Sequence, residues 1–182
     1  MRIISTALRL YSLLLALALS WIYFQNQLQW AFFIRLNHEK LLLDLLVGLS
    51  SAAFIIGLSI FSTKNFLWGQ LLEDEFSKVL VPLQIWEIAL IALLSGLVEE
   101  TLFRGAIQPV LGLIPTSLLF GLAHFVPRKV FLPWSAYATF AGFLLGSVAE
   151  LTRNLFPVIL AHCVINFVLI LVLNRRGSMQ PA

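Results

Sequence analysis

The chain has 182 residues, of which 60% are hydrophobic and only 12% charged, and its formal net charge is +3. This composition supplies too few polar groups to cover a water-soluble globule and is too apolar for a disordered chain. A disulfide-held scaffold is excluded as well, because Cys163 is the only cysteine. The sequence therefore predicts an all-α, polytopic transmembrane helical bundle with about six spans of about 20 residues each.

In chain order, the apolar segments that predict these spans are 7–24, 41–61, 82–104, 116–126, 134–151 and 155–173. A polar loop at 25–40 separates the first two segments, and Gly105 and Pro109 are expected to end the third. Segment 62–81 mixes acidic with aromatic residues and predicts an amphipathic helix at the membrane surface. The first segment could instead be a cleaved signal peptide, but the further apolar segments favour an uncleaved span.

Ionisable side chains inside a bilayer are costly and therefore indicate function by default. In the run EETLFR, Glu100 and Arg104 are four positions apart, so they can pair on one helix face. Glu99 lies about 100° further round the helix and stays available for proton transfer. The alternative is that both glutamates and the arginine form a purely structural ion-pair cluster at a span end.

Two later segments carry the runs FGLAH, which ends in His124, and HCVIN, in which His162 and Asn166 share a helix face. Each of these side chains could simply bond to a neighbouring helix. Counted along each helix from the same side of the membrane, however, Glu99, His124 and His162 lie about 8, 12 and 10 Å deep. This agreement in depth favours a common site over scattered structural residues.

The predicted site has the groups that water-mediated amide hydrolysis needs. A carboxylate and an imidazole beside one water can act as general base and general acid. A second imidazole and an amide on one helix face can donate hydrogen bonds to a developing oxyanion. Cys163 adjoins His162 but faces about 100° away from it, and it is interpreted as a packing residue rather than a nucleophile.

With these three runs in this order on three apolar segments, the sequence resembles the CPBP intramembrane protease family. That family includes type II CAAX prenyl endopeptidases and bacteriocin-processing or Abi-like immunity proteins, and the resemblance covers 84–173. It implies that Glu99 and His124 activate water, that His162 and Asn166 stabilise the oxyanion, and that Glu100 and Arg104 support the site. Eukaryotic CAAX enzymes have eight spans rather than six, and no feature of the sequence indicates a prenylated substrate.

The resemblance further implies a metal-free, glutamate-type intramembrane endopeptidase. Its expected partners are a membrane-embedded or lipidated peptide or protein and the lipid bilayer, with no nucleic acid. Its expected location is a bacterial plasma membrane or a bacterial-derived organelle membrane. The chain is then divided into N-terminal spans with an amphipathic connector (1–81), a CPBP-like catalytic core (82–174) and a polar tail (175–182).

Two other functions are compatible with the same residues. Glu99, His124 and His162 are residue types that can hold zinc, although the HExxH spacing is absent. A non-catalytic membrane protein is the other alternative, either an immunity or scaffold protein or a proton-coupled transporter. No inverted repeat of the kind that many transporters have is visible in the sequence.

The distribution of basic residues predicts the orientation in the membrane. The side that carries the N-terminus holds eight Lys and Arg residues and the opposite side three, with Arg104 left out. The eight are Arg2, Arg9, Lys64, Lys78, Arg128, Lys129, Arg175 and Arg176, and the three are Arg35, Lys40 and Arg153. The positive-inside rule then places 105–115 away from the cytoplasm. The CAAX relatives, which reach their substrates from the cytosol, argue for the opposite orientation.

Overall fold

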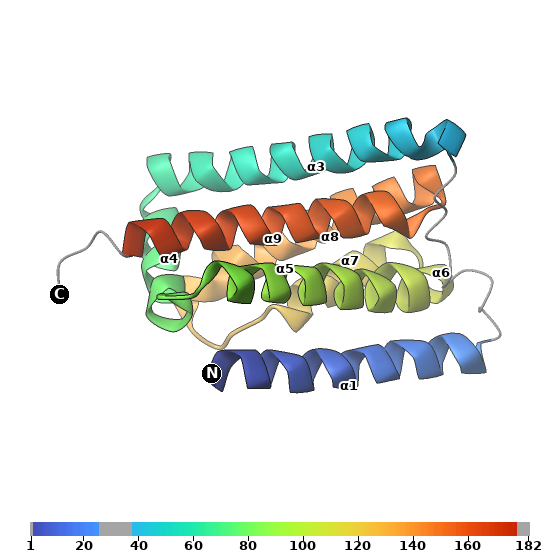
Figure 1. Ribbon diagram of the computed structural model, residues 1–182, viewed down its shortest axis with the longest axis horizontal. Coiled ribbons are helices and arrows are strands. Elements are labelled where there is room, and N and C mark those ends of the chain that lie inside the picture. The colour runs from blue at the N-terminus through green and yellow to red at the C-terminus, as the bar shows by residue number, and fades with distance from the viewer. Residues whose placement is uncertain (1, 26–37, 178–182) are drawn as a thin grey trace.

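A computed structural model describes residues 2–25 and 38–177, and every regular element within these ranges is helical. The longer helices run side by side along one direction (Figure 1). The elements are α1 (Arg2–Phe24), α3 (His38–Asn65), α4 (Leu67–Leu80), α5 (Ile85–Glu100), the π-helix η1 (Thr101–Ile107), α6 (Gln108–Leu111), α7 (Leu113–Ala123), the 3-10 helix η2 (Lys129–Phe131), α8 (Leu132–Thr152) and α9 (Leu155–Gly177). Most of the predicted loop at 25–40 and of the predicted tail lies outside the described residues.

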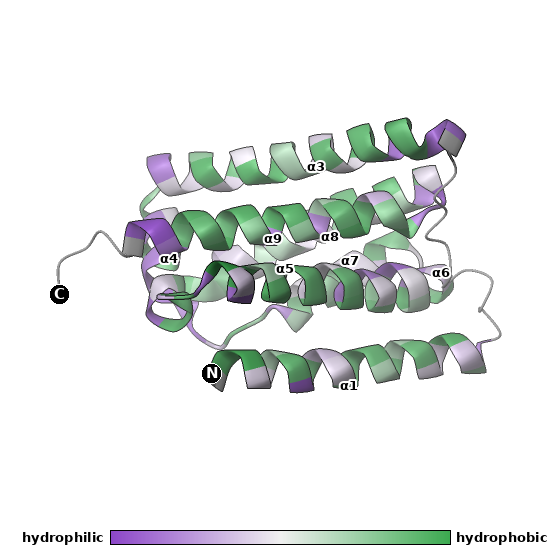
Figure 2. Cartoon of the chain, viewed as in Figure 1, coloured by the Kyte–Doolittle hydropathy of each residue, from purple (hydrophilic) through white to green (hydrophobic). Residues whose placement is uncertain are grey.

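Among the described residues, four helices are long and apolar enough to cross a membrane, and they correspond to α1, α3, α8 and α9. A fifth candidate is the pair formed by α4 and the continuous segment Ile85–Leu111, which meet at a bend of 110°. α7 is a shorter apolar helix of 11 residues. These helices are apolar along most of their length, and many of their polar residues lie near the ends (Figure 2). The predicted all-α, polytopic membrane bundle is confirmed. The predicted number of about six spans is too high for the described residues, which hold four or up to five candidate spans, because α7, the predicted fourth span, has only 11 residues.

α4 is the predicted amphipathic helix, and it lies across the end of the bundle where α1 starts and α9 ends (Figure 1). Leu67, Leu71 and Val79 on this helix are exposed apolar side chains. Two of its acidic residues are paired with cations of other segments: Glu73 binds Arg176 at 2.8 Å, and Glu75 binds Arg128 at 2.7 Å. Ion pairs thus tie α4 to α9 and to the segment before α8.

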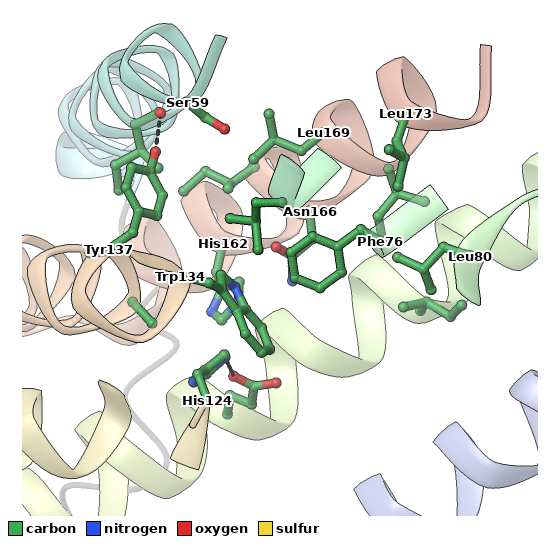
Figure 3. Close-up of a pocket in the computed structure, with 18 of the residues that line it drawn as sticks. Ser59, Phe76, Leu80, His124, Trp134, Tyr137, His162, Asn166, Leu169 and Leu173 are labelled. Carbon is green, nitrogen blue, oxygen red and sulfur yellow. Dashed lines mark hydrogen bonds and ion pairs between the residues drawn. The ribbon is translucent and has the colours of Figure 1, made fainter. Parts of the chain in front are cut away.

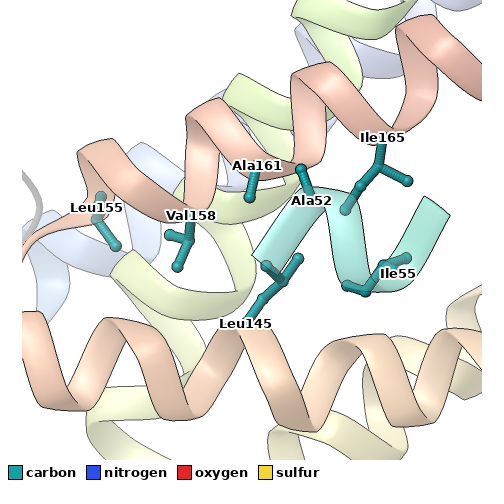
Figure 4. Packing of buried hydrophobic residues seen from close by; sticks show 7 residues of the cluster. All are labelled: Ala52, Ile55, Leu145, Leu155, Val158, Ala161 and Ile165. Carbon is teal, nitrogen blue, oxygen red and sulfur yellow. The ribbon is translucent and has the colours of Figure 1, made fainter. Parts of the chain in front are cut away.

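The buried core lies between α3, α8 and α9, where small and branched side chains interlock (Figure 4). Its buried members are Ala52, Ile55, Leu145, Leu155, Val158, Ala161 and Ile165. α5 packs against the other side of α9 at very close range: a Cβ on Gly96 would lie 2.8 Å from the backbone nitrogen of Cys163. Small residues therefore bring the helices that carry the polar groups into contact.

Two predicted helix boundaries are wrong. The third helical segment does not end at Gly105 or Pro109 but continues to Leu111, because Pro109 occupies the first turn of α6, where no intrahelical N–H bond is required. Gly112, with a φ of 80°, then ends the segment. α7 ends at Ala123, so His124 is the residue that terminates this helix rather than a residue inside it.

Candidate active site

The helix that carries the two adjacent glutamates changes character directly after them. α5 passes without a break into the π-helix η1. A π-helix contains more residues per turn than an α-helix, and such turns are frequent at functional sites. The two glutamates meet different surroundings: Glu99 lines a cavity, whereas Glu100 is fully buried.

Glu100 is the centre of a buried ionic cluster. Its Oε1 contacts Arg104 Nη1 at 3.1 Å and His162 Nδ1 at 2.6 Å, and Arg104 Nε lies 3.1 Å from Oε2. Arg104 also donates a hydrogen bond to the Gly142 carbonyl, and its guanidinium lies 4.5 Å from the centroid of the Phe120 ring. The predicted pairing of Glu100 with Arg104 is confirmed. Glu100 Oε2 and Arg104 Nε form an ion pair without a hydrogen bond, and Glu100 does not line the cavity, so its carboxylate is enclosed by its ion-pair partners rather than open to a water molecule.

Glu99 is free of the arginine, as its position on the helix predicts. Its Oε1 accepts a hydrogen bond from the Tyr11 hydroxyl at 3.0 Å. Its Oε2 is buried, has no hydrogen-bond partner among the described residues, and lies 3.6 Å from His124 Nε2. An ionised carboxylate oxygen in an apolar site needs a donor. This oxygen is therefore suited to accept a hydrogen bond, and then a proton, from a water molecule.

His124 is oriented by the end of its own helix. Its Nδ1 lies 2.7 Å from the Phe120 carbonyl oxygen, which can only accept, so Nδ1 carries the proton. The Nε2 atom of the neutral ring is then an acceptor that faces Glu99. The rings of Phe120 and Trp134 pack against the imidazole, with centroids 4.5 Å and 5.1 Å away. The end of α7 and the start of α8 together fix the direction of this imidazole.

His162 and Asn166 project from α9 into the same cavity as His124 (Figure 3). Because His162 Nδ1 donates to the Glu100 carboxylate, the ring presents Nε2 to other groups. Nε2 can donate a hydrogen bond only when the ring is doubly protonated. Asn166 donates from Nδ2 to Ser95 Oγ at 2.7 Å, which fixes the orientation of its amide.

The cavity has a volume of about 710 Å³ and is lined mainly by apolar side chains. Volumes of this size are typical of ligand sites. The cavity includes the polar groups just described, and it continues along α9 to α4, where Phe76 and Leu80 line it (Figure 3). Glu73 and Arg176, which bind each other, belong to the same lining. The cavity thus connects the polar site to the end of the bundle that α4 covers.

The zinc alternative finds no preformed ligand set in the part of the chain that the structure describes. Within those ranges, no group of three His, Cys, Asp or Glu side chains is arranged to hold a metal ion. Of the three residues named for that alternative, His162 directs its Nδ1 at Glu100, whereas Glu99 and His124 face each other. Cys163 packs on Gly96 and lies 4.0 Å from the Leu93 carbonyl oxygen, as expected for a packing residue.

Three contacts of the site were not predicted: those of Tyr11 with Glu99, of His162 with Glu100 and of Ser95 with Asn166. The first joins positions 88 residues apart, and no local pattern in the sequence signals it. The second follows from two observations that were available, a buried carboxylate and an imidazole at similar depth. The preference of a buried imidazole for a carboxylate was the signal that could have revealed it.

Comparisons with known proteins add the following. Residues 81–168 match the family described as type II CAAX prenyl endopeptidase Rce1-like. The chain is 38% identical over 102 residues to the uncharacterized protein YpbD of Bacillus subtilis (strain 168), a match that covers 55% of this chain and 50% of that protein. The match therefore spans about half the length of this curated relative. No solved structure matches the chain significantly.

Proposed function

We propose that this protein, whose residues 81–168 match the Rce1-like family of type II CAAX prenyl endopeptidases, belongs to that family and is a glutamate-type intramembrane endopeptidase. The match agrees with the family predicted from the three sequence motifs. The observation that carries the proposal is the pair formed by Glu99 Oε2 and His124 Nε2. The two atoms lie 3.6 Å apart in the lining of an apolar cavity, and the carboxylate oxygen has no other hydrogen-bond partner among the described residues.

In the first step, a water molecule donates hydrogen bonds to Glu99 and His124. Glu99 takes one proton while the water oxygen forms a bond to the carbonyl carbon of the scissile amide. The carbonyl π electrons move to the oxygen, which becomes an oxyanion. In the second step, the C–N bond breaks as the amine nitrogen receives the proton that Glu99 took. The products are a free amine and a carboxylic acid, which ionises by releasing its proton to water.

The oxyanion needs donors that are in place before the charge develops. Asn166 can supply an amide N–H, because its orientation is fixed by Ser95. His162 can supply Nε2–H in its doubly protonated form, with its Nδ1 held on the Glu100 carboxylate. In this scheme Glu100 and Arg104 do not touch the substrate. Glu100 holds His162 in place, and the pairing with Arg104 keeps Glu100 from competing with Glu99 as a base.

The apolar lining of the cavity supports a membrane-embedded or lipidated peptide as the substrate. An extended apolar segment can lie along α9 while its amide reaches Glu99 and His124. Activity in the membrane also follows from the position of the site within helices of the bundle. The division of the chain into an N-terminal part up to residue 81 and a catalytic part from residue 82 is a further element of this proposal.

The experiment that tests the proposal is comparative peptidomics of membranes from cells that express the native protein or Glu99→Ala at equal levels. We expect new peptide termini in the native sample that are missing from the variant. If the two sets of termini coincide, the protein is not a Glu99-dependent protease, and the non-catalytic immunity, scaffold or transporter functions take its place. A stoichiometric metal in the purified protein, with activity lost to a chelator, would instead favour the zinc hydrolase.

A further inference from the structure

α1 lies outside the segment that matches the family, yet it contributes a side chain to the site. Tyr11 lines the cavity, and its hydroxyl donates the 3.0 Å hydrogen bond to Glu99 Oε1. On the same helix, Ala18 and Ile22 are fully buried, and α1 packs against both α5 and η1. The phenol is therefore held against the carboxylate by a packed helix rather than by a loose segment.

The two oxygens of Glu99 consequently have different neighbours. Tyr11 occupies Oε1, while Oε2 faces His124 and has no other partner among the described residues. A single hydrogen bond to one oxygen fixes the rotation of the carboxylate plane, so the other oxygen points at the place where a water contacts His124.

We propose that Tyr11 is a positioning residue of the active site, which orients Glu99, so that α1 completes a site that the matched segment alone does not contain. This inference rests on the proposed role of Glu99 as the proton acceptor. The other ionisable groups around Glu99 are His124 at the end of α7 and the cluster of Glu100, Arg104 and His162.

The test compares Tyr11→Phe with Tyr23→Phe in the purified protein, on a substrate peptide identified by the peptidomics. The two variants are matched, because Tyr23 lies on the same helix but is 64% exposed and does not line the cavity. For Tyr11→Phe we expect kcat to fall about tenfold to a hundredfold with KM nearly unchanged, as for loss of a hydrogen bond to a charged group. Tyr23→Phe should leave kcat close to native.

The inference is overturned if Tyr11→Phe keeps native kcat, or if both tyrosine variants lose activity equally. Thermal unfolding in detergent, with equal midpoints for the two variants, keeps a folding defect from imitating the effect. Glu99→Gln separates this inference from the proposed function. If Glu99→Gln is inactive while Tyr11→Phe is native-like, only the role of Tyr11 is wrong. If Glu99→Gln is active, the proposed function itself fails.

Discussion

Arg104 shows how tightly single residues are constrained in this site. It is only 4% exposed, and its guanidinium is divided between the Glu100 carboxylate, the Gly142 carbonyl and the Phe120 ring. An arginine in such a position has no water to replace a lost partner. Its neighbour Glu100 is equally dependent on it, because the carboxylate is fully buried.

We therefore expect Arg104→Ala to lower the free energy of unfolding by about 3–5 kcal/mol, because it leaves a buried carboxylate without its main counter-ion. The double variant Glu100→Gln with Arg104→Met removes both charges and should regain part of that stability. Thermal unfolding of the purified proteins in detergent measures both effects. Destabilisation of the double variant by the full sum of the two single variants would show that the pair is not coupled.

The same residues show what sequence reasoning can reach. The pairing of Glu100 with Arg104 was predictable, because helical spacing alone brings residues four positions apart together. The separation of Glu99 from that pair follows from the same geometry. The contact of Tyr11 with Glu99 was not predictable, because it depends on how α1 packs against α5, which no spacing within one helix encodes.

At the scale of helices, the close approach of α5 and α9 at a glycine decides where the polar groups lie. α5 and α9 touch at Gly96, where a Cβ would lie 2.4 Å from Cys163 Sγ and 2.8 Å from Cys163 N. The sulfur could turn away, but the backbone nitrogen could not. This contact lies one turn from Glu99 and Glu100, so it sets their distance from His162.

Gly96→Ala should therefore force α5 and α9 apart and lower both activity and the unfolding temperature. Gly57→Ala is the matched control, because no atom lies within 4 Å of the Cβ that it would add on α3. This control should be neutral or slightly stabilising, since alanine is the better helix former. Equal behaviour of the two variants in thermal unfolding and peptide cleavage would refute the importance of the close α5–α9 approach.

The ion pairs of α4 give an expectation about pH. Lys78, at 2.6 Å, and Arg128, at 2.7 Å, lower the pKa of Glu75 from its usual value. A carboxylate with a lowered pKa contributes its attraction at neutral pH and loses it only as the pH falls through that lowered value. Between about pH 5 and 8 Glu75 stays ionised, so Glu75→Gln should leave the shape of the kcat/KM profile unchanged. If the kcat/KM profile of this variant lacks its acid limb, the group that titrates there lies in α4 rather than in the site.

The ends of helices were less predictable than their existence. Pro109 was expected to end a span, but it lies in the first turn of α6, directly after the π-helix. π-helices have no sequence signature comparable to a proline or a helix-capping residue, so this π-helix was not predicted. His124 was placed within a span but terminates α7 instead, where its ring bonds to the carbonyl of Phe120.

At the scale of the whole molecule, the structure brings two conflicting arguments about orientation into agreement. The basic residues predict that the end of the bundle with α4, Lys129 and Arg176 faces the cytoplasm. The cavity runs from Glu99 toward this same end, where Phe76 of α4 lines it. Access from the cytosol, as the family resemblance implies, is then compatible with the charge distribution.

This orientation is tested with single cysteines in a Cys163→Ser background. Gln108 is a poor reporter, because it is buried and hydrogen-bonded to Gly146, whereas Leu111 near it is 46% exposed. We expect an impermeant thiol reagent to label Leu111→Cys in intact cells. It should label Lys129→Cys, an exposed position at the other end, only after the membrane is opened. The reverse pattern would place the α4 end outside the cytoplasm.

The central claim is that Glu99, and not its neighbour, takes a proton from the water that cleaves the substrate. The most direct measurement is the rate of peptide hydrolysis by purified Glu99→Gln, which keeps the shape of the side chain but replaces its basic oxygen. Glu87→Gln on the same helix is the control, because Glu87 lies in the first turn of α5 and outside the cavity lining. The account predicts no detectable cleavage by folded Glu99→Gln and near-native cleavage by Glu87→Gln. Near-native cleavage by Glu99→Gln would contradict it.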